Sequence, residues 1–142
     1  MANRKKGKIF KAEEVGKQLR AAGLRPTRQR VALAALLGET HRHITAESLH
    51  AEARTAGIEV VLATVYNTLH QFTQAGLLRE VVVDSQRSYF DTNTGPHHHF
   101  FCEDDATLID IPGEAIQVAR VPPPPQGMAV DRVDVVVRVK RA

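Results

Sequence analysis

The first apolar pattern along the chain has helical spacing. Val15, Leu19 and Ala22 recur over the segment 11–22, which predicts a helix. Gly23 follows in the place where a left-handed C-terminal cap is expected.

Two more helices are predicted after the extended step that Pro26 imposes. Thr27 is a suitable N-cap for the second helix, whose apolar residues make it largely buried: Val31, Leu33, Ala34, Leu36 and Leu37. Thr45 can cap a third helix that stops at Gly57. Because Ser48, and not Glu or Gln, stands at the partner position, the cap is predicted to be only half of a capping box.

The segment 62–76 predicts a fourth helix with one apolar and one polar side. Val65, Leu69 and Phe72 fall at i, i+4 and i+7 and face a core. The other side is polar and uncharged, with Thr64, Tyr66, Asn67, Thr68 and Gln71. Such side chains can read base edges in a major groove, whereas an ordinary solvated helix face usually carries Glu and Lys. The pattern favours a DNA-recognition helix over a solvated face.

The period changes to that of strands after the fourth helix. Segments 77–83 and 87–91 flank a polar turn at 84–86 and predict a β-hairpin. Helices followed by such a hairpin compose a winged helix, the helix-turn-helix variant with a hairpin at its edge. Arg79 and Arg87 on this wing are predicted to contact phosphate, which positions a protein without specifying sequence.

A polar hinge at 92–96 divides the chain. We predict an α+β protein with a winged helix-turn-helix DNA-binding domain at 1–91 and a small α/β dimerisation and ligand-sensing domain at 97–142. Within the first domain, residues 1–10 are predicted to form a flexible basic tail.

The second domain is predicted to be a small sheet. Segments 97–103 and 107–111 form a hairpin, 114–120 is at most a short helix, and 122–125 is a stiff proline connector. In the last strand one face is lined by valines, namely Val133, Val135, Val137 and Val139. Three strands expose edges and enclose too little core to be independent, which predicts a homodimer.

Charge is distributed unevenly along the 142 residues. Residues 1–30 carry ten Lys and Arg against two acids, a balance of +8, whereas residues 92–142 carry five against seven, a balance of −2. Only the N-terminal part is expected to meet a polyanion. The sequence has no apolar run of the roughly 20 residues that span a bilayer and no secretory pattern at its start. With Cys102 as the single cysteine, this predicts a soluble cytoplasmic protein.

Three adjacent histidines begin the second domain. A strand would send His97 and His99 to one face and His98 to the other, so that two of them could share a ligand. A purification-tag remnant or a solvated polar turn are the alternatives.

Four strings of the sequence resemble one known family. LRPTRQR, LATVYNTLHQFTQAGLL, SYFDTN and HHHFF look like the ferric uptake regulator superfamily and, within it, the iron response regulator (Irr) branch, over about residues 13–142. The resemblance implies a dimeric winged-helix transcription factor, not an enzyme, that binds AT-rich operators in double-stranded DNA. It also implies control of iron homeostasis and haem synthesis.

The resemblance assigns site residues by position. It places a regulatory site for a divalent metal on His43, Asp91, His97, His99 and Asp110. Imidazole and carboxylate together suit Fe, Mn, Co or Zn. It matches Tyr66 to a base-contacting tyrosine and Arg25 to a basic residue that enters the minor groove, so the predicted DNA contacts are Arg25, Thr64, Tyr66, Asn67 and Arg79.

The chain departs from the family pattern at its cysteines. Most of the superfamily holds a structural zinc with two C-x-x-C pairs, and one cysteine cannot form that four-thiolate site. A second auxiliary metal site is also depleted, since its later positions read Gln117 and approximately Lys140. Some Irr proteins have a Cys-Pro haem motif, but here Cys102 precedes Glu103. The remaining haem candidates are His97, His98 and His99.

Three other functions are compatible with these residues. A peroxide sensor is one, because an iron site with His and Asp ligands can oxidise its own histidines. A zinc or manganese uptake regulator is the second. A metalloenzyme that uses the His cluster is the third, although nothing resembles a nucleophile and base pair or a metal-bound water with a positioned general base.

Overall fold

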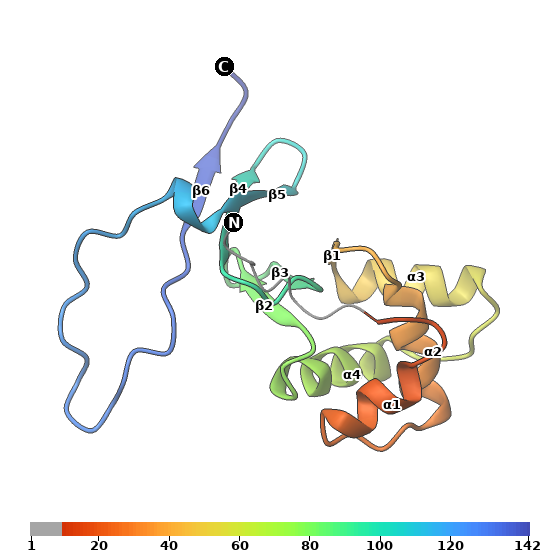
Figure 1. Ribbon diagram of the computed structural model, residues 1–142. Coiled ribbons are helices and arrows are strands. Elements are labelled where there is room, and N and C mark those ends of the chain that lie inside the picture. The colour runs from red at the N-terminus through yellow and green to blue at the C-terminus, as the bar shows by residue number, and fades with distance from the viewer. Residues whose placement is uncertain (1–9) are drawn as a thin grey trace. The chain divides into compact units, whose positions relative to one another are not determined.

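The computed structural model describes residues 10–142 and divides into two compact units, with the boundary between Gly95 and Pro96 (Figure 1). The predicted hinge at 92–96 spans this boundary. Nearly all of the predicted flexible tail at 1–10 lies outside the described residues.

Four helices form most of the first unit. They are α1 (Val15–Ala21), α2 (Arg28–Leu37), α3 (Ala46–Thr55) and α4 (Leu62–Gln74). The Thr27 hydroxyl accepts a hydrogen bond from the backbone N–H of Arg30 at 3.3 Å, which caps α2 as predicted. Gly23 has φ +81° and lies after the end of α1, where a side chain would strain the left-handed backbone.

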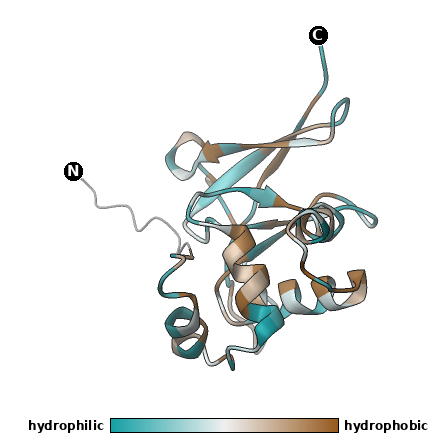
Figure 2. Ribbon diagram, turned by 90° about the vertical axis from the view of Figure 1, so that its right-hand side faces the viewer, coloured by the Kyte–Doolittle hydropathy of each residue, from teal (hydrophilic) through white to brown (hydrophobic). Residues whose placement is uncertain are grey.

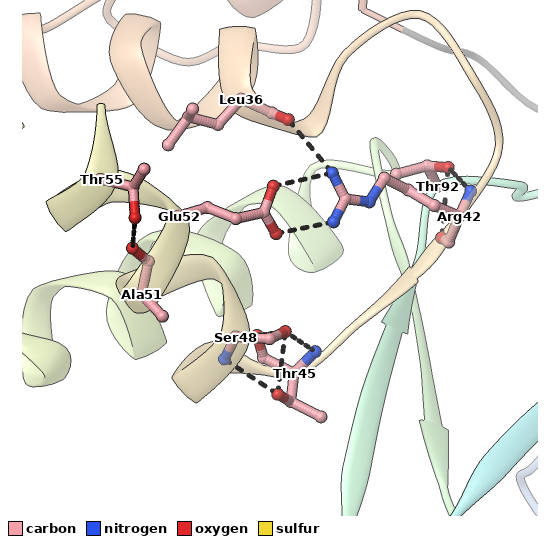
Figure 3. A network of polar contacts seen from close by, with 8 residues as sticks. All are labelled: Leu36, Arg42, Thr45, Ser48, Ala51, Glu52, Thr55 and Thr92. Carbon is pink, nitrogen blue, oxygen red and sulfur yellow. Dashed lines mark hydrogen bonds and ion pairs between the residues drawn. The ribbon is translucent and has the colours of Figure 1, made fainter.

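The cap of α3 is more complete than the sequence predicted. Thr45 Oγ1 accepts from the N–H of Ser48 at 3.1 Å, and Ser48 Oγ accepts from the N–H of Thr45, also at 3.1 Å (Figure 3). The prediction of half a capping box was therefore wrong. A serine hydroxyl reaches the N-cap N–H and replaces the longer Glu or Gln of the usual motif.

A three-stranded sheet completes the first unit. The predicted hairpin is β2 (Arg79–Val82) and β3 (Ser88–Asp91), and a short strand, β1 (His43–Ile44), adds to it in the order β1-β3-β2. β1 has two residues and was not predicted, because so short a strand leaves no periodic pattern. Its register places His43 directly opposite Asp91.

The core of the first unit lies where the four helices meet the sheet. Val65, Leu69 and Phe72 of α4 are fully buried, as predicted, and the Phe72 ring packs against that of Phe10 with centroids 5.6 Å apart. Figure 2 shows hydrophobic and hydrophilic residues on the same helices, as expected of amphipathic helices that cover a core. The prediction of an α+β fold with a winged helix is confirmed.

The second unit is a three-stranded sheet with one 3-10 turn. It contains β4 (His97–Cys102), β5 (Thr107–Pro112), η1 (Gly113–Ala115) and β6 (Val136–Val139), in the sheet order β5-β4-β6. β6 runs parallel to β4, so the chain must cross back before it. The excursion between η1 and β6 has no helix or strand, and Figure 1 shows it as a wide loop.

The predicted valine face is only partly strand. β6 begins only at Val136, so Val133 and Val135 belong to the irregular segment before it. Inside the sheet, Val137 pairs with Phe100, which pairs with Ile109 on the other side. Val137, Phe100 and Ile109 are 36%, 37% and 54% exposed. A row of apolar side chains that is only partly covered by the described residues therefore crosses one face of the sheet.

Among the described residues, no helix is both long enough and apolar enough to cross a membrane.

Candidate functional site

The three histidines alternate between the two faces of β4. His97 and His99 are buried, at 6% and 1% exposure, and His98 lies half-buried on the opposite face. The predicted separation of the three rings is confirmed, and its cause is the two-residue period of a strand. Only His97 and His99 can share a ligand.

Asp110 completes a three-residue set with these two rings, which we call the β4–β5 triad. It lies opposite His99 in the register of β4 and β5. Its Oδ1 is 3.6 Å from His97 Nε2 and 3.4 Å from His99 Nε2, and the two imidazole rings lie 4.5 Å apart. Two nitrogens and one carboxylate oxygen therefore converge on one point of the sheet.

The β4–β5 triad fits a small divalent ion. Two ligand atoms that are each about 2.1 Å from one ion lie about 3.0–3.4 Å apart in octahedral or tetrahedral geometry. The ligand atoms of the triad all lie within 4.8 Å of one another, so small rotations suffice. Imidazole and carboxylate suit Fe, Mn, Co and Zn alike.

The first unit holds a second imidazole and carboxylate pair. His43 Nε2 lies 3.2 Å from Asp91 Oδ2, and the side chain of Asp91 is only 1% exposed. The other oxygen of Asp91 accepts a hydrogen bond from the N–H of Asn93 at 2.8 Å. That bond fixes the carboxylate and directs Oδ2 towards His43.

An ion-pair network holds the strand ends that carry this pair (Figure 3). The N–H of Arg42 donates to Thr92 Oγ1 at 2.8 Å, and the N–H of Thr92 donates to the Arg42 carbonyl at 3.1 Å. The Arg42 guanidinium donates to both carboxylate oxygens of Glu52 on α3, at 3.0 and 2.6 Å, and to the carbonyl of Leu36 at 3.4 Å. The residues next to His43 and Asp91 are thereby attached to α2 and α3.

The Arg42–Glu52 ion pair and the Arg42–Thr92 hydrogen bond should contribute differently to the free energy of unfolding. Glu52→Ala is expected to lower the free energy of unfolding by about 1 kcal/mol or less, because an ion pair exposed by about one third is screened by water. Thr92→Val should cost about 1–3 kcal/mol, because the Thr92 hydroxyl is buried and its loss removes the acceptor for the part-buried N–H of Arg42. Urea unfolding of both variants measures this, and a larger loss for Glu52→Ala would contradict it.

His98 is a poor metal or haem ligand in this arrangement. Its Nδ1 accepts a hydrogen bond from the backbone N–H of Val135 at 3.1 Å. A neutral ring that accepts at Nδ1 carries its proton on Nε2, so neither nitrogen has a lone pair left for iron. The sequence placed His98 among the haem candidates, and the contact with Val135 argues against that assignment.

The outward side of α4 is narrower than predicted. Tyr66, at 37% exposure, and Asn67 face solvent, and Thr64 is half-buried. Thr68 is 4% exposed, so its predicted outward position was wrong; it lies next to Leu69 on the side that faces the core. Gln71 accepts from the Arg30 guanidinium at 3.2 and 3.0 Å and so ties α4 to α2.

The arginines that were predicted to contact DNA differ in their exposure. Arg25 is exposed, as a groove contact requires. Arg79 is 6% exposed, and its Nη1 donates to the carbonyl of Gly95 at 3.4 Å. The prediction that Arg79 contacts phosphate is therefore not supported: the strand period puts it on the buried face with Val81. Arg87 forms an ion pair with Asp84 in the turn of the wing.

Tyr66 has a partner that the sequence did not reveal. Its hydroxyl donates to Glu47 Oε1 at 2.9 Å, and its ring stacks on His70 with centroids 6.3 Å apart. The hydrogen bond to Glu47 is the main cause that raises the pKa of Tyr66, with smaller contributions from burial and the Glu47 charge. In the sequence, Glu47 is an ordinary acid in the first turn of a helix, so no local signal marks it.

Comparison with known proteins decides the family. Residues 21–124 match the family model described as the ferric uptake regulator family. The chain belongs to that family. The peroxide-responsive repressor PerR of Staphylococcus aureus is 35% identical over 98 residues, which are 69% of this chain and 66% of the repressor, slightly less than two thirds of its length.

Solved structures of this family share the fold. The ferric uptake regulator from Pseudomonas aeruginosa with manganese is 30% identical, with a TM-score of 0.68, over 89% of this chain and 97% of that chain. The ferric uptake regulator of Vibrio cholerae is 27% identical, with a TM-score of 0.70, over 89% of this chain and 98% of that chain.

Proposed function

We propose that this protein is a metal-responsive transcription regulator that binds double-stranded DNA as a homodimer. The observation that carries the proposal is a winged helix in a chain with two imidazole and carboxylate sets, His43 with Asp91 and the β4–β5 triad. The family resemblance assigns both sets to one regulatory metal site. DNA affinity then depends on the metal.

The metal ligands are His43, Asp91, His97, His99 and Asp110, and the DNA contacts are Arg25, Thr64, Tyr66 and Asn67. Asn67 can pair with adenine through two hydrogen bonds, and Arg25 can enter a narrow minor groove, which suits an AT-rich operator.

The regulated process is iron homeostasis and haem synthesis, as the resemblance to the Irr branch implies. A peroxide-responsive repressor is the second candidate, which the 35% identity to the S. aureus protein supports. Manganese is a further candidate effector, because the related P. aeruginosa structure holds that metal.

We also propose haem as an effector, and the remaining candidate ligands for its iron are His97 and His99. Both are also members of the β4–β5 triad, so haem iron competes with the divalent metal for the same nitrogens. Haem should then weaken metal-dependent DNA binding.

The test is an operator selection with purified protein, followed by affinity measurements with the selected duplex. Iron, manganese and zinc are compared with chelator, and haem and hydrogen peroxide are added to each metal form. Selection of a sequence whose affinity rises with one metal supports the proposal. A protein that selects no sequence with any metal contradicts it. A loss of affinity on addition of haem favours the Irr function, and an irreversible loss with peroxide favours the second candidate.

The homodimer gives a prediction about the apolar row Phe100, Ile109 and Val137. Ile109→Asp should raise the dissociation constant of the dimer by about two orders of magnitude or more, because an unpaired carboxylate would be buried at the interface. Val118→Asp is the control, since Val118 is 45% exposed in the excursion outside the sheet. Sedimentation measures the dissociation constants of both variants.

Chelator should leave the wild-type dimer intact, because one cysteine cannot form a four-thiolate zinc site.

A further inference from the structure

The hydroxyl of Tyr66 already donates a hydrogen bond in the protein without DNA. It donates to Glu47 Oε1 at 2.9 Å. A phenol has one proton and two lone pairs. While Glu47 holds the proton, Tyr66 can offer a base only an acceptor.

We propose that Glu47 is a specificity-determining residue, because it fixes the direction of the hydrogen bond that Tyr66 can make with a base. The inference rests on the proposed DNA-binding function. With Glu47 in place, Tyr66 accepts from an exocyclic amine, adenine N6 or cytosine N4. It does not donate to thymine O4 or to guanine O6 and N7.

The backbone of Glu47 and the ring of Tyr66 both have local support. Glu47 lies in the first turn of α3, two residues after the N-cap Thr45, which forms reciprocal hydrogen bonds with Ser48. The Tyr66 ring stacks on His70, which also lies edge-on to Phe90 with centroids 5.4 Å apart. The hydrogen bond therefore joins an exposed carboxylate on a capped helix turn to a phenol whose ring is stacked.

The position of the pair suits contact with a groove. Tyr66 lies in the N-terminal half of α4, and in a helix-turn-helix the N-terminal residues of the recognition helix contact base edges. A cavity of about 220 Å³ opens beside the pair, between Thr45 and the wing residues Ser88 and Tyr89. The pair therefore lies on the surface that joins the recognition helix to the wing.

The pKa of Tyr66 agrees with this contact. Glu47 raises it above the usual value of 10.0, which means that the protonated phenol is stabilised. The hydrogen bond is fully present below the pKa of a free tyrosine and is lost as pH rises through the raised value. At neutral pH Tyr66 is protonated and donates to Glu47.

The test compares base preference among matched variants in one operator selection. Wild type should prefer adenine or cytosine at the base that Tyr66 contacts, by about tenfold over thymine and guanine. Glu47→Ala and Glu47→Gln should reduce that preference to about twofold or less. Glu59→Gln is the control, because Glu59 is an exposed acid between α3 and α4. It removes the same charge, so it should strengthen binding to all sequences alike and leave the preference unchanged.

A double variant identifies the atom responsible. Tyr66→Phe removes the hydroxyl, so Glu47→Ala should change no base preference in a Tyr66→Phe background. In a Tyr89→Phe background Tyr66 is the only tyrosine, and its ultraviolet titration should move to lower pH when Glu47 becomes Gln.

Two results would overturn the inference while the proposed function stands. They are an unchanged preference in Glu47→Ala, and a wild-type preference for thymine or guanine at this base. If wild type selects no sequence with any metal, the proposed function and the inference both fail.

Discussion

His99→Ala should weaken metal binding by about 100-fold or more, since even residues that only support a metal ligand contribute 10- to 100-fold. His99 is 1% exposed and its Nε2 lies 3.4 Å from Asp110 Oδ1, so its loss removes one of the two imidazole nitrogens that converge on this carboxylate. Titration with manganese or zinc, followed by operator affinity at a fixed metal concentration, measures the loss.

The neighbouring histidine provides the matched control. His98→Ala removes the same ring from the same strand but from the opposite face, where it accepts from the N–H of Val135. It should change metal affinity by less than about threefold. Equal losses for His98→Ala and His99→Ala would contradict the assignment of the β4–β5 triad.

The His43→Ala variant tests whether a single ion takes ligands from both units or binds only to the second unit. If one ion takes ligands from both units, this variant should weaken metal binding about tenfold or more and reduce metal-dependent DNA affinity. Unchanged metal binding, with His99→Ala still deficient, would restrict the ion to the second unit.

DNA affinity should fall by about three orders of magnitude between 50 and 200 mM salt, provided that the dimer makes about six or more phosphate contacts. The expectation rests on exposed basic residues among the described part of the N-terminal region, namely Lys11, Lys17, Arg20, Arg25 and Arg28. Each contact that is lost lowers the slope of log affinity against log salt by about one. A slope near zero would contradict a phosphate-dominated interface.

Arg28, which is exposed, and Arg79, which is buried, should affect the salt dependence of DNA affinity differently. Arg28→Gln should reduce the salt slope, because Arg28 is exposed at the start of α2. Arg79→Gln should reduce stability and leave the slope unchanged, because Arg79 is 6% exposed and donates to the carbonyl of Gly95. The reverse result would restore the phosphate contact that the sequence predicted for Arg79.

The sequence by itself determined the features that depend on local periodicity. The spacing of Val65, Leu69 and Phe72 sufficed to place α4 and its buried side, and Thr27 sufficed to place the start of α2. The alternation of His97 to His99 followed from the period of a strand. The family also followed from the sequence, because the resemblance rests on strings of residues.

Only the tertiary structure decided which polar side chains are in contact. Glu47 and Tyr66 are 19 residues apart, and Arg42 and Thr92 are 50 apart. No local pattern encodes either distance. The two-residue strand β1 likewise exists only because β3 pairs with it, and that pairing places His43 against Asp91. Periodicity reports which side of an element is buried, whereas the partner of a polar group depends on how distant elements pack.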